Sequence, residues 1–445
     1  MGHNQGTKLT GCARTLALLA MLGAAACTDD LPLNDLPHDR DSTTGGGSPS
    51  VAYGAGGNEF LVAFSGDSTP GASNDSKVFG RRVSASGALV GSPTPLITAV
   101  TEPGPTASAY ASADDHFLVA TIDHPGTNVN DVVVQLVDGA GLPVGPDDQH
   151  VGGSFARDLA IAYGAAAGEY LVVWLDGAAQ NSGTIQVRRI DAATGLAIGA
   201  GASIVASPVS ANGGVDVAYN ATADEYLVVA AAPASTAYRA VAVRLDGATA
   251  APIGSVFPVG APANTSFISP AVAYGASSDR YLVVWSIDSD EQELGQFLDG
   301  SSGVEIGGDF QVTHAALGAY DPALAYDAAQ QDFVLVTHIG SATSQGAAEE
   351  TAYQRIDAST GANACPFEVV VSDRNPVTGL PNAGIPTNGP GTGVAVSTAS
   401  GRFLATWPAT TFLEYLPPPP PGGTYVYESD AQADLSSATA ACADM

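Results

Sequence analysis

The sequence is poor in basic residues. It has 15 Lys and Arg residues against 45 Asp and Glu residues, a formal net charge of −30 over 445 residues. We therefore expect no nucleic-acid partner, because phosphate binding relies on contacts from Lys and Arg. The acidity would suit solubility or cation binding, but a surface that is simply rich in Asp is the favoured explanation.

Familiar catalytic motifs are also lacking. The seven His residues do not have a zinc-ligand spacing such as H-E-x-x-H, and the chain has neither a G-x-S-x-G elbow nor a phosphate-binding loop. We therefore predict no cofactor. The ion that the many carboxylates would suit is Ca²⁺.

No uncharged apolar run is long enough to span a bilayer. The run from Thr15 to Ala26, "TLALLAMLGAAA", follows Lys8 and Arg14, ends in small residues and stops at Cys27. This is the pattern of a secretory signal peptide, which we predict over residues 1–26. A Pro-, Gly- and Ser-rich segment over residues 27–48 is predicted to be a flexible tether.

Cysteine is scarce, with Cys12, Cys27, Cys365 and Cys442 only. The context of Cys27, "GAAACTDD", resembles a bacterial lipobox, which implies that Cys27 is the lipidated first residue of the mature protein. Ordinary signal cleavage with an incidental Cys27 is the alternative. Because disulfides persist outside the cytoplasm, we predict a bond between Cys365 and Cys442, with two free thiols as the alternative.

One strand pattern recurs along the chain. It reads "EYLVVWLDG" at Glu169, and close copies begin at Glu59, Glu225 and Arg280. Its aromatic residue recurs at intervals of 52 to 57 residues, then 70, at Phe60, Phe117, Tyr170, Tyr226, Tyr281, Phe333 and Phe403. A Tyr seven residues earlier marks a preceding strand in six copies. The two strands predict a hairpin, and a second half with an Asp/Gly turn adds two more strands.

A four-stranded sheet repeated at this length is typical of a β-propeller blade. The stretch "YLVVW" is apolar on consecutive residues, which predicts burial on both faces, as in blades stacked around an axis. Tandem β-sandwiches would need about seven strands per unit. We therefore predict an all-β fold, a seven-bladed β-propeller of four-stranded antiparallel blades, over residues 49–445.

The units, "YLVVW" followed by an R-x-D-x-x-G turn, resemble those of bacterial exported lipoproteins with β-propeller-type repeats. The resemblance covers residues 49 to 445 and implies the architecture alone. The sequence motifs of WD40 blades, sialidases and integrin-type calcium loops do not occur, so the activities of those families are not carried over.

Two positions of the repeat carry opposite charges in five copies. One position directly precedes the recurring aromatic residue, and the other lies two residues before the turn Asp of the third strand. The pairs are Glu59 with Arg82, Glu169 with Arg189, Glu225 with Arg244, Asp332 with Arg355, and, with the signs exchanged, Arg402 with Glu428. We predict cross-strand ion pairs that fix the strand register. Anion binding by these Arg residues is the alternative.

An Asp ends the predicted second strand in four copies: Asp67, Asp123, Asp176 and Asp288. Closure of a ring would bring these acids around one rim, where they could hold Ca²⁺ or assist sugar chemistry. The alternative is an Asp that only hydrogen-bonds the backbone of its own turn.

The predicted function follows from the predicted export signal and the fold. We predict a non-catalytic binding or scaffolding module, exported and displayed on the outer membrane or cell surface by acylated Cys27, with the periplasmic face as an alternative location. Its ligand would be a protein or a glycan. The alternatives are a carbohydrate-active hydrolase or lyase that uses the rim carboxylates, and a structural component of an outer-membrane assembly.

Overall fold

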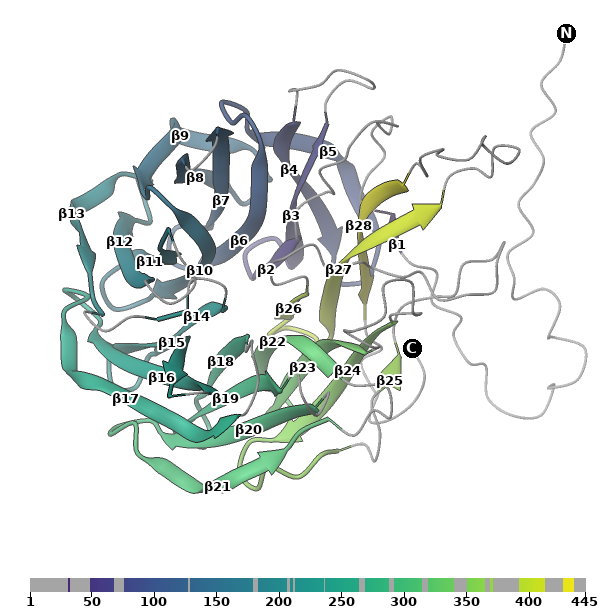
Figure 1. Ribbon diagram of the computed structural model, residues 1–445. Helices are drawn as coiled ribbons and strands as arrows, with labels where there is room; N and C mark the ends of the chain where they lie inside the picture. The colour runs from purple at the N-terminus through teal and green to yellow at the C-terminus, as the bar shows by residue number, and fades with distance from the viewer. Residues whose placement is uncertain are drawn as a thin grey trace, which may run out of the picture.

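The computed structural model describes residues 31–32, 49–67, 76–126, 129–178, 183–205, 209–210, 213–235, 237–263, 269–287, 292–313, 319–339, 350–364, 369–370, 392–412 and 427–435. Figure 1 shows their strands arranged as small sheets around a common centre. Within this part of the chain, no helix is long and apolar enough to cross a membrane.

Six blades follow one another, each an antiparallel sheet whose four strands pair in chain order. Blades 1 to 3 are β2 (Ser50–Gly54), β3 (Glu59–Asp67), β4 (Ser76–Ser84), β5 (Leu89–Ile97); β6 (Pro103–Ala111), β7 (His116–Gly126), β8 (Val129–Asp138), β9 (Pro143–Gly152); and β10 (Ala156–Gly164), β11 (Glu169–Asp176), β12 (Thr184–Asp191), β13 (Ala197–Ser203). The first strand of each lies nearest the centre (Figure 1).

Blades 4 to 6 repeat this plan. They are β14 (Val215–Asn220), β15 (Glu225–Ala234), β16 (Ala237–Asp246), β17 (Pro252–Ala263); β18 (Pro270–Gly275), β19 (Arg280–Ile287), β20 (Gln292–Asp299), β21 (Glu305–Gln311); and β22 (Ala319–Asp327), β23 (Asp332–Ile339), β24 (Glu350–Asp357), β25 (Val369–Val370). The fold is therefore an all-β propeller of four-stranded antiparallel blades.

The sequence predicted seven blades of this kind, and the structure has six. The chain after blade 6 contributes β26 (Gly393–Val396), β27 (Phe403–Phe412) and β28 (Tyr427–Leu435). Their sheet has the order β1-β28-β27-β26, with its fourth strand, β1 (Leu31–Pro32), supplied by the start of the chain. We call it the closing sheet. Within the described residues the last repeat supplies three strands, and β1 pairs with the edge that β28 would otherwise leave open.

The closing sheet lies between the ends of the blade series, because β26 contacts both β22 of blade 6 and β2 of blade 1. The two residues of β1 belong to the segment predicted as a tether, so this part of the tether is held in a sheet. The predicted signal peptide, the rest of the tether and all four cysteines, including Cys27, Cys365 and Cys442, lie outside the described residues.

The hydrophobic core lies between neighbouring blades. Residues Tyr170 to Trp174 of β11 are at most 3% exposed, which confirms the predicted burial on both faces. On one face Tyr170 packs in a cluster with Leu118 of blade 2. On the other face Leu171 packs with Val228 of blade 4. Burial of side chains of this size contributes about 1.5–3 kcal/mol each, so the apolar strand is what joins the blades.

The recurring Tyr of the first strand has a second role at the hairpin turns. Tyr219 donates a hydrogen bond to Asp224 Oδ1 at 2.7 Å, and the main-chain N–H of Ala166 in blade 3 donates to the Tyr219 hydroxyl at 3.3 Å. Asp224 has a positive φ of 53°, a conformation that Asp adopts more readily than most residues. The Tyr therefore fixes its own turn and ties it to the previous blade.

Candidate functional site

Four of the sequence-predicted ion pairs are present. The nitrogen–oxygen distances are 2.8 Å for Arg82 and Glu59, 2.6 Å for Arg189 and Glu169, 2.6 Å for Arg244 and Glu225, and 2.7 Å for Arg355 and Asp332. The partners are diagonal neighbours rather than directly opposed, because Glu169 lies opposite Asp191 and Arg189 lies opposite Leu171. Long side chains reach such diagonal positions on one face of a sheet.

The fifth predicted pair, Arg402 with Glu428, is wrong. The register of β27 and β28 places Glu428 opposite Thr411, nine positions along the strand from Arg402. The spacing of the other copies does not transfer, because β27 begins its pairing at Leu404 with Leu435. Arg402 instead donates from Nη1 to the main-chain oxygen of Ala85 at 3.2 Å.

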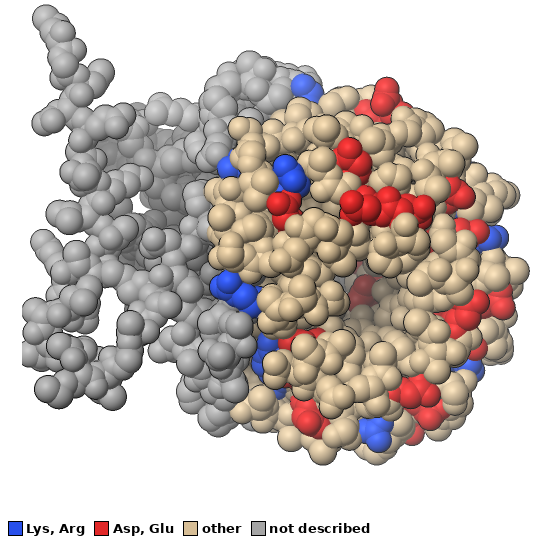
Figure 2. Space-filling model, turned by 180° about the vertical axis from the view of Figure 1, so that it is seen from behind, with Lys and Arg blue, Asp and Glu red and all other residues tan. Residues whose placement is uncertain are grey.

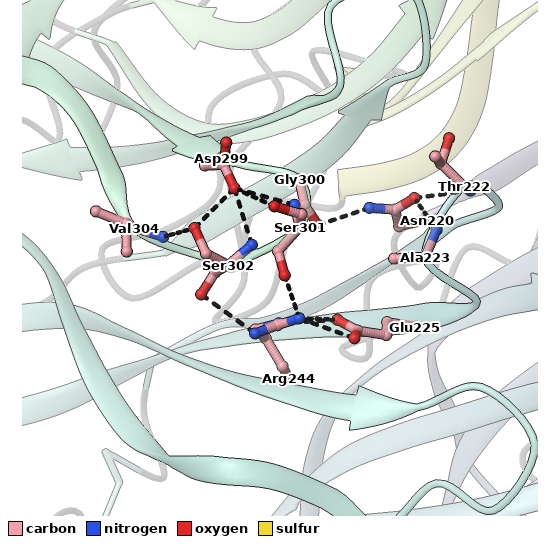
Figure 3. Close-up of polar contacts among 10 residues, drawn as sticks. All are labelled: Asn220, Thr222, Ala223, Glu225, Arg244, Asp299, Gly300, Ser301, Ser302 and Val304. Carbon is pink, nitrogen blue, oxygen red and sulfur yellow. Dashed lines mark hydrogen bonds and ion pairs between the residues drawn. The ribbon is translucent and has the colours of Figure 1, made fainter.

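The Arg side chains do more than pair with acids. Arg244 of blade 4 also donates to the main-chain oxygens of Ser301 and Ser302, at 2.5 and 3.2 Å, in the β20–β21 turn of blade 5 (Figure 3). The Asp299 carboxylate holds that turn by accepting from the main-chain N–H of Ser302 at 2.9 Å. Glu225 thus orients a guanidinium that clamps the next blade. We call this contact the inter-blade clamp.

The clamp also occurs where the acid–base pair is missing. In blade 2, His116 Nδ1 lies 3.1 Å from the main-chain oxygen of Ala192 in the third-to-fourth strand turn of blade 3. In blade 5, Arg280 donates to the main-chain oxygen of Ser359 in blade 6 at 2.5 Å. These contacts favour the structural interpretation of the repeated Arg positions over anion binding, since the donors face backbone carbonyls.

The carboxylates of two predicted rim acids accept hydrogen bonds from backbone N–H groups. Asp123 is 3% exposed, and its Oδ1 accepts from the N–H groups of Thr101 and Glu102 at 2.8 and 3.1 Å. Asp176 accepts in the same way from Ser154 and Phe155, at 3.1 and 3.2 Å. Each Asp therefore holds the linker that enters its own blade, rather than its own turn.

The other two rim acids give no information on a site. The side chain of Asp67 and the whole of Asp288 lie outside the described residues. Among the residues that are described, no group of three or more His, Cys, Asp or Glu residues is placed to hold a metal ion. A Ca²⁺ site on the rim thus has no support from Asp123 and Asp176.

A different set of acids lies where the innermost strands begin. Asp158 on β10 is 4% exposed, and its Oδ2 accepts from the N–H of Val215 in blade 4 at 2.7 Å. Asp216 on β14 repeats this contact, since its Oδ2 accepts from the N–H of Val272 in blade 5 at 2.7 Å. Asp321 occupies a bulge of β22 with a positive φ of 55°. We call these three residues the axial acids.

Burial changes the acidity of this cluster. Desolvation is the main cause that raises the pKa of the Asp158 carboxyl to about 7. Hydrogen bonds from the backbone of Val215 and Leu159 lower this pKa, and the charges of Asp216 and Asp321 make smaller raising contributions. Burial also raises the pKa of Asp216 to about 7, although the residue as a whole is partly exposed. Because Asp321 acts on Asp158 from blade 6, the three carboxyls share one electrostatic environment at the ring centre.

The Asp158 carboxylate has one hydrogen bond of good geometry, from the N–H of Val215 to Oδ2. Its buried Oδ1 has no partner of such geometry among the described residues, although the backbone N–H of Leu159 is close enough to lower the pKa of the carboxyl. Buried polar atoms usually have partners, and an unpaired one costs about 1–3 kcal/mol. Figure 2 shows the centre of the ring hollowed on one face, with an acidic side chain visible inside the hollow. The axial acids are therefore the candidate functional site.

Sequence reasoning missed the axial acids although a signal was present. Asp158 and Asp216 interrupt small or apolar first strands, in "RDLAIAYG" and "GVDVAYN". Asp158 and Asp321 share one repeat position, five residues before the recurring Tyr, which the other copies fill with Ser, Pro or Gly. Asp216 takes a position that the other copies fill with Ala, Ser or Gly. Occasional Asp residues on an otherwise small or apolar inner strand were the sign of a site.

A second buried polar cluster lies between blades 5 and 6. Thr337 donates to Glu293 Oε1 at 2.8 Å, and both residues are fully buried. Next to them the His338 ring packs against the Tyr320 ring at an interplanar angle of 37°, with ring centroids 5.7 Å apart. Burial lowers the pKa of His338 to about 4, so this imidazole is neutral at pH 7. The cluster borders residues 340–349, which lie outside the described part.

Comparisons with known proteins carry no argument for the function of this chain. No protein-family profile matches the chain, and no curated protein matches it. Solved structures that resemble it include a GH43_1 enzyme from Xanthomonas citri, at 13% identity over 76% of this chain and 94% of that one, with a TM-score of 0.39. A mutant of the NanB sialidase from Streptococcus pneumoniae shares 6% identity over 91% and 70%, with a TM-score of 0.47.

A fucose-specific lectin from Aleuria aurantia is similar at 12% identity over 68% of this chain and 88% of that one, with a TM-score of 0.43. These likenesses join enzymes and a lectin at identities where function is not transferable. At TM-scores below 0.5 they carry no argument for the fold or for any one activity.

Proposed function

We propose that this protein is a non-catalytic binding or scaffolding module, held on a bacterial membrane by a lipid on Cys27. The observation that carries the proposal is the use of Asp123 and Asp176. Their carboxylates accept two backbone N–H groups each, which makes them parts of the scaffold rather than acid–base or nucleophilic groups. The export pattern that ends at Cys27 supports the membrane location.

The anchor and the ring are close together in this proposal. Cys27 precedes β1 at Leu31–Pro32 by four positions. A fully extended chain spans at most about 3.6 Å per residue, so the lipidated end would lie within about 15 Å of the closing sheet. The closing sheet would therefore face the membrane, and only a short segment would connect the lipid to the ring.

We also propose that the closing sheet is the seventh blade. Two contacts support this: β26 touches the innermost strands of blades 6 and 1, and Arg402 donates to the backbone of Ala85 in blade 1. A blade built from both ends of the chain removes free sheet edges. It would also tie the membrane-proximal segment to ring closure.

Fractionation of cells tests the anchor directly. The wild-type protein should sediment with membranes and take up labelled palmitate, whereas Cys27→Ala should do neither. Cys12→Ala is the matched control, because Cys12 belongs to the part that processing removes, and it should behave as wild type. Palmitate uptake by Cys27→Ala would contradict the proposal.

A carbohydrate-active hydrolase is the second candidate. The observation in its favour is that the pKa values of Asp158 and Asp216 lie at about 7, the range in which a carboxyl acts as a general acid near neutral pH. Turnover of any member of a broad glycan panel that disappears in Asp158→Asn would favour the hydrolase. Binding of a glycan without turnover would favour the module.

A further inference from the structure

Most of the exposed large apolar side chains share one position of the repeat. Among the described residues the exposed ones are Val129 at 53%, Leu142 at 51%, Leu196 at 52% and Val304 at 63%. Leu142, Leu196 and Val304 lie in the turns between the third and fourth strands of blades 2, 3 and 5. The main-chain oxygen of each accepts a hydrogen bond from the N–H of the turn Asp, at 2.8 to 2.9 Å. The turn therefore holds each residue in the same fixed place.

The other three blades also have an apolar residue at this position. The same hydrogen bond identifies it as Ala88 in blade 1, Ala251 in blade 4 and Ala362 in blade 6, and all three are exposed. Single exposed apolar residues are normal on protein surfaces. An exposed turn position can hold any polar residue, however, and none of the six blades has one there. We call Leu142, Leu196 and Val304 the apolar turn residues.

These residues lie on one face of the ring. The four strands of each blade pair antiparallel in chain order. The turn between the first and second strands and the turn between the third and fourth strands therefore lie on the same face, which we call the turn face. Val129 is the first residue of β8, whose last residue meets the turn face. Val129 therefore lies on the opposite face.

The chain from Cys27 joins the ring at the turn face. The strand β27 begins there, because Arg402 just before it bonds the β4–β5 turn of blade 1. The strand β28 runs antiparallel to β27 and ends at Leu435, beside the start of β27. The strand β1 is antiparallel to β28, with Leu31 opposite Ala433 near that end. Thus β1 begins at the turn face and runs away from it.

We propose that the turn face rests on the lipid bilayer, with Leu142, Leu196 and Val304 inserted at its surface. This inference rests on the proposed lipid anchor and adds the orientation of the ring. The anchor would hold the turn face at a high effective concentration near the bilayer, so a small apolar area is enough to dock it. Residues on rigid turns lose little conformational freedom on insertion. The opposite face would then point away from the membrane, towards a ligand.

The lipid that suits this face is neutral. Each apolar turn residue follows a turn Asp, and hydrogen bonds from the Ser302 and Ser301 side chains lower the pKa of the Asp299 carboxyl to about 2. This carboxylate is therefore charged at neutral pH, and its charge repels anionic headgroups. Insertion of apolar side chains into a zwitterionic bilayer does not depend on basic residues.

Tryptophan fluorescence of the full-length, lipidated protein tests the proposal. The protein is reconstituted into phosphatidylcholine vesicles with and without brominated acyl chains, which quench Trp emission on contact. The native residues Trp174, Trp285 and Trp407 are at most 3% exposed. They give a background that is the same in all variants.

The new Trp residues report the orientation of the ring. Leu142→Trp, Leu196→Trp and Val304→Trp should each lose more emission than wild type on brominated vesicles. Val129→Trp is the matched control, because Val129 is equally exposed on the opposite face, and it should lose no more than wild type. Quenching of Val129→Trp as strong as that of the others, or of none of the variants, would overturn the proposal.

A second measurement uses the native side chains, because Trp itself favours membrane interfaces. Amide hydrogen exchange in the turns of blades 2, 3 and 5 should slow when wild type is bound to phosphatidylcholine vesicles. The triple variant Leu142→Ser, Leu196→Ser, Val304→Ser should lose this protection. Equal protection of Cys27→Ala in solution without vesicles would assign the face to a contact between copies and would also overturn the proposal. The triple variant should still take up palmitate, so failure of docking is distinct from failure of the anchor.

Discussion

Arg402 of the closing sheet donates a hydrogen bond to the main-chain oxygen of Ala85, 317 positions earlier in the chain, at 3.2 Å. Ala85 lies in the turn between β4 and β5 of blade 1. The clamps made by Arg244 and Arg280 reach the same turn of the blade that follows theirs. The contact of Arg402 therefore resembles the inter-blade clamps, and it joins the closing sheet to blade 1.

Removal of this clamp should loosen the closure. We expect Arg402→Met to lower the free energy of unfolding by about 1–2 kcal/mol, the usual worth of a hydrogen bond from a charged donor. Amide hydrogen exchange should rise in β2 and β26. Arg157→Met is the control, because Arg157 bonds the main-chain oxygen of Gly177 within blade 3, and its effect should stay in that blade. Unchanged exchange in β2 of Arg402→Met would contradict the role assigned to Arg402.

The clamp of blade 4 allows its two parts to be separated. Arg244→Met should cost about 2–4 kcal/mol, because it leaves the mostly buried Glu225 carboxylate unpaired and frees the turn of blade 5. Glu225→Gln should cost less, since Arg244 keeps its two backbone acceptors. A double-mutant cycle by denaturant unfolding should give a coupling of about 1 kcal/mol or more. A coupling near zero would show that Glu225 does not orient Arg244.

Close packing in the Asp-Gly turns explains why Gly follows the turn Asp. A Cβ on Gly300 would lie 2.7 Å from the main-chain oxygen of Asp279, which sits at a positive φ of 49°. We expect Gly300→Ala to lower the free energy of unfolding by about 1–3 kcal/mol through overpacking. Gly308 has nothing within 4 Å of such a Cβ, so Gly308→Ala should be close to neutral. Thermal unfolding of both variants measures the difference, and equal melting temperatures would contradict this account.

The axial acids should make stability depend on pH. The pKa of Asp158 is raised from 3.8 to about 7 in the folded chain, so the folded state binds its proton more tightly than the unfolded state does. This contribution is fully present below about pH 4 and is lost as the pH rises to about 7. Each unit of pKa difference corresponds to about 1.4 kcal/mol, so one group contributes on the order of a few kcal/mol.

Comparison of wild type with Asp158→Asn isolates this effect. His338 acts in the opposite direction, because its lowered pKa makes the fold less stable as the pH falls from 6.5 towards 4. The difference between wild type and Asp158→Asn cancels the His338 contribution. The advantage of wild type over the variant should grow as the pH is lowered from 8 to 5. Parallel curves of unfolding free energy against pH would mean that Asp158 keeps an ordinary pKa in the folded protein.

The strands were predictable because their composition is typical of strands buried on both faces. The run from Tyr170 to Trp174 is apolar on consecutive residues, and it is buried on both faces. The charge partner of Glu169 was also predictable, because a cross-strand pair leaves a correlated trace between repeats. The diagonal geometry was not, since the repeat spacing gives the partner and leaves its exact offset open by two residues.

Other features could not be predicted because they depend on closure. Nothing in "LP" at Leu31 indicates a strand, and its pairing with Ala433 and Gln432 exists only once the ring brings both ends together. Glu428 was misassigned because β27 and β28 pair in a register that the other copies do not share. The axial acids were overlooked because Asp158 and Asp216 belong to different positions of their strands, and only the ring brings their fields together.

The mass of the mature N-terminal peptide tests the central claim most directly. The protein should be extracted with detergent from its own membranes, digested and examined by mass spectrometry. We predict that the mature chain begins at Cys27 and carries acyl groups on that residue, close to the β1 segment that completes the closing sheet. A mature chain that retains residues 1–26, or that begins elsewhere without a lipid, would contradict the account of a membrane-displayed module.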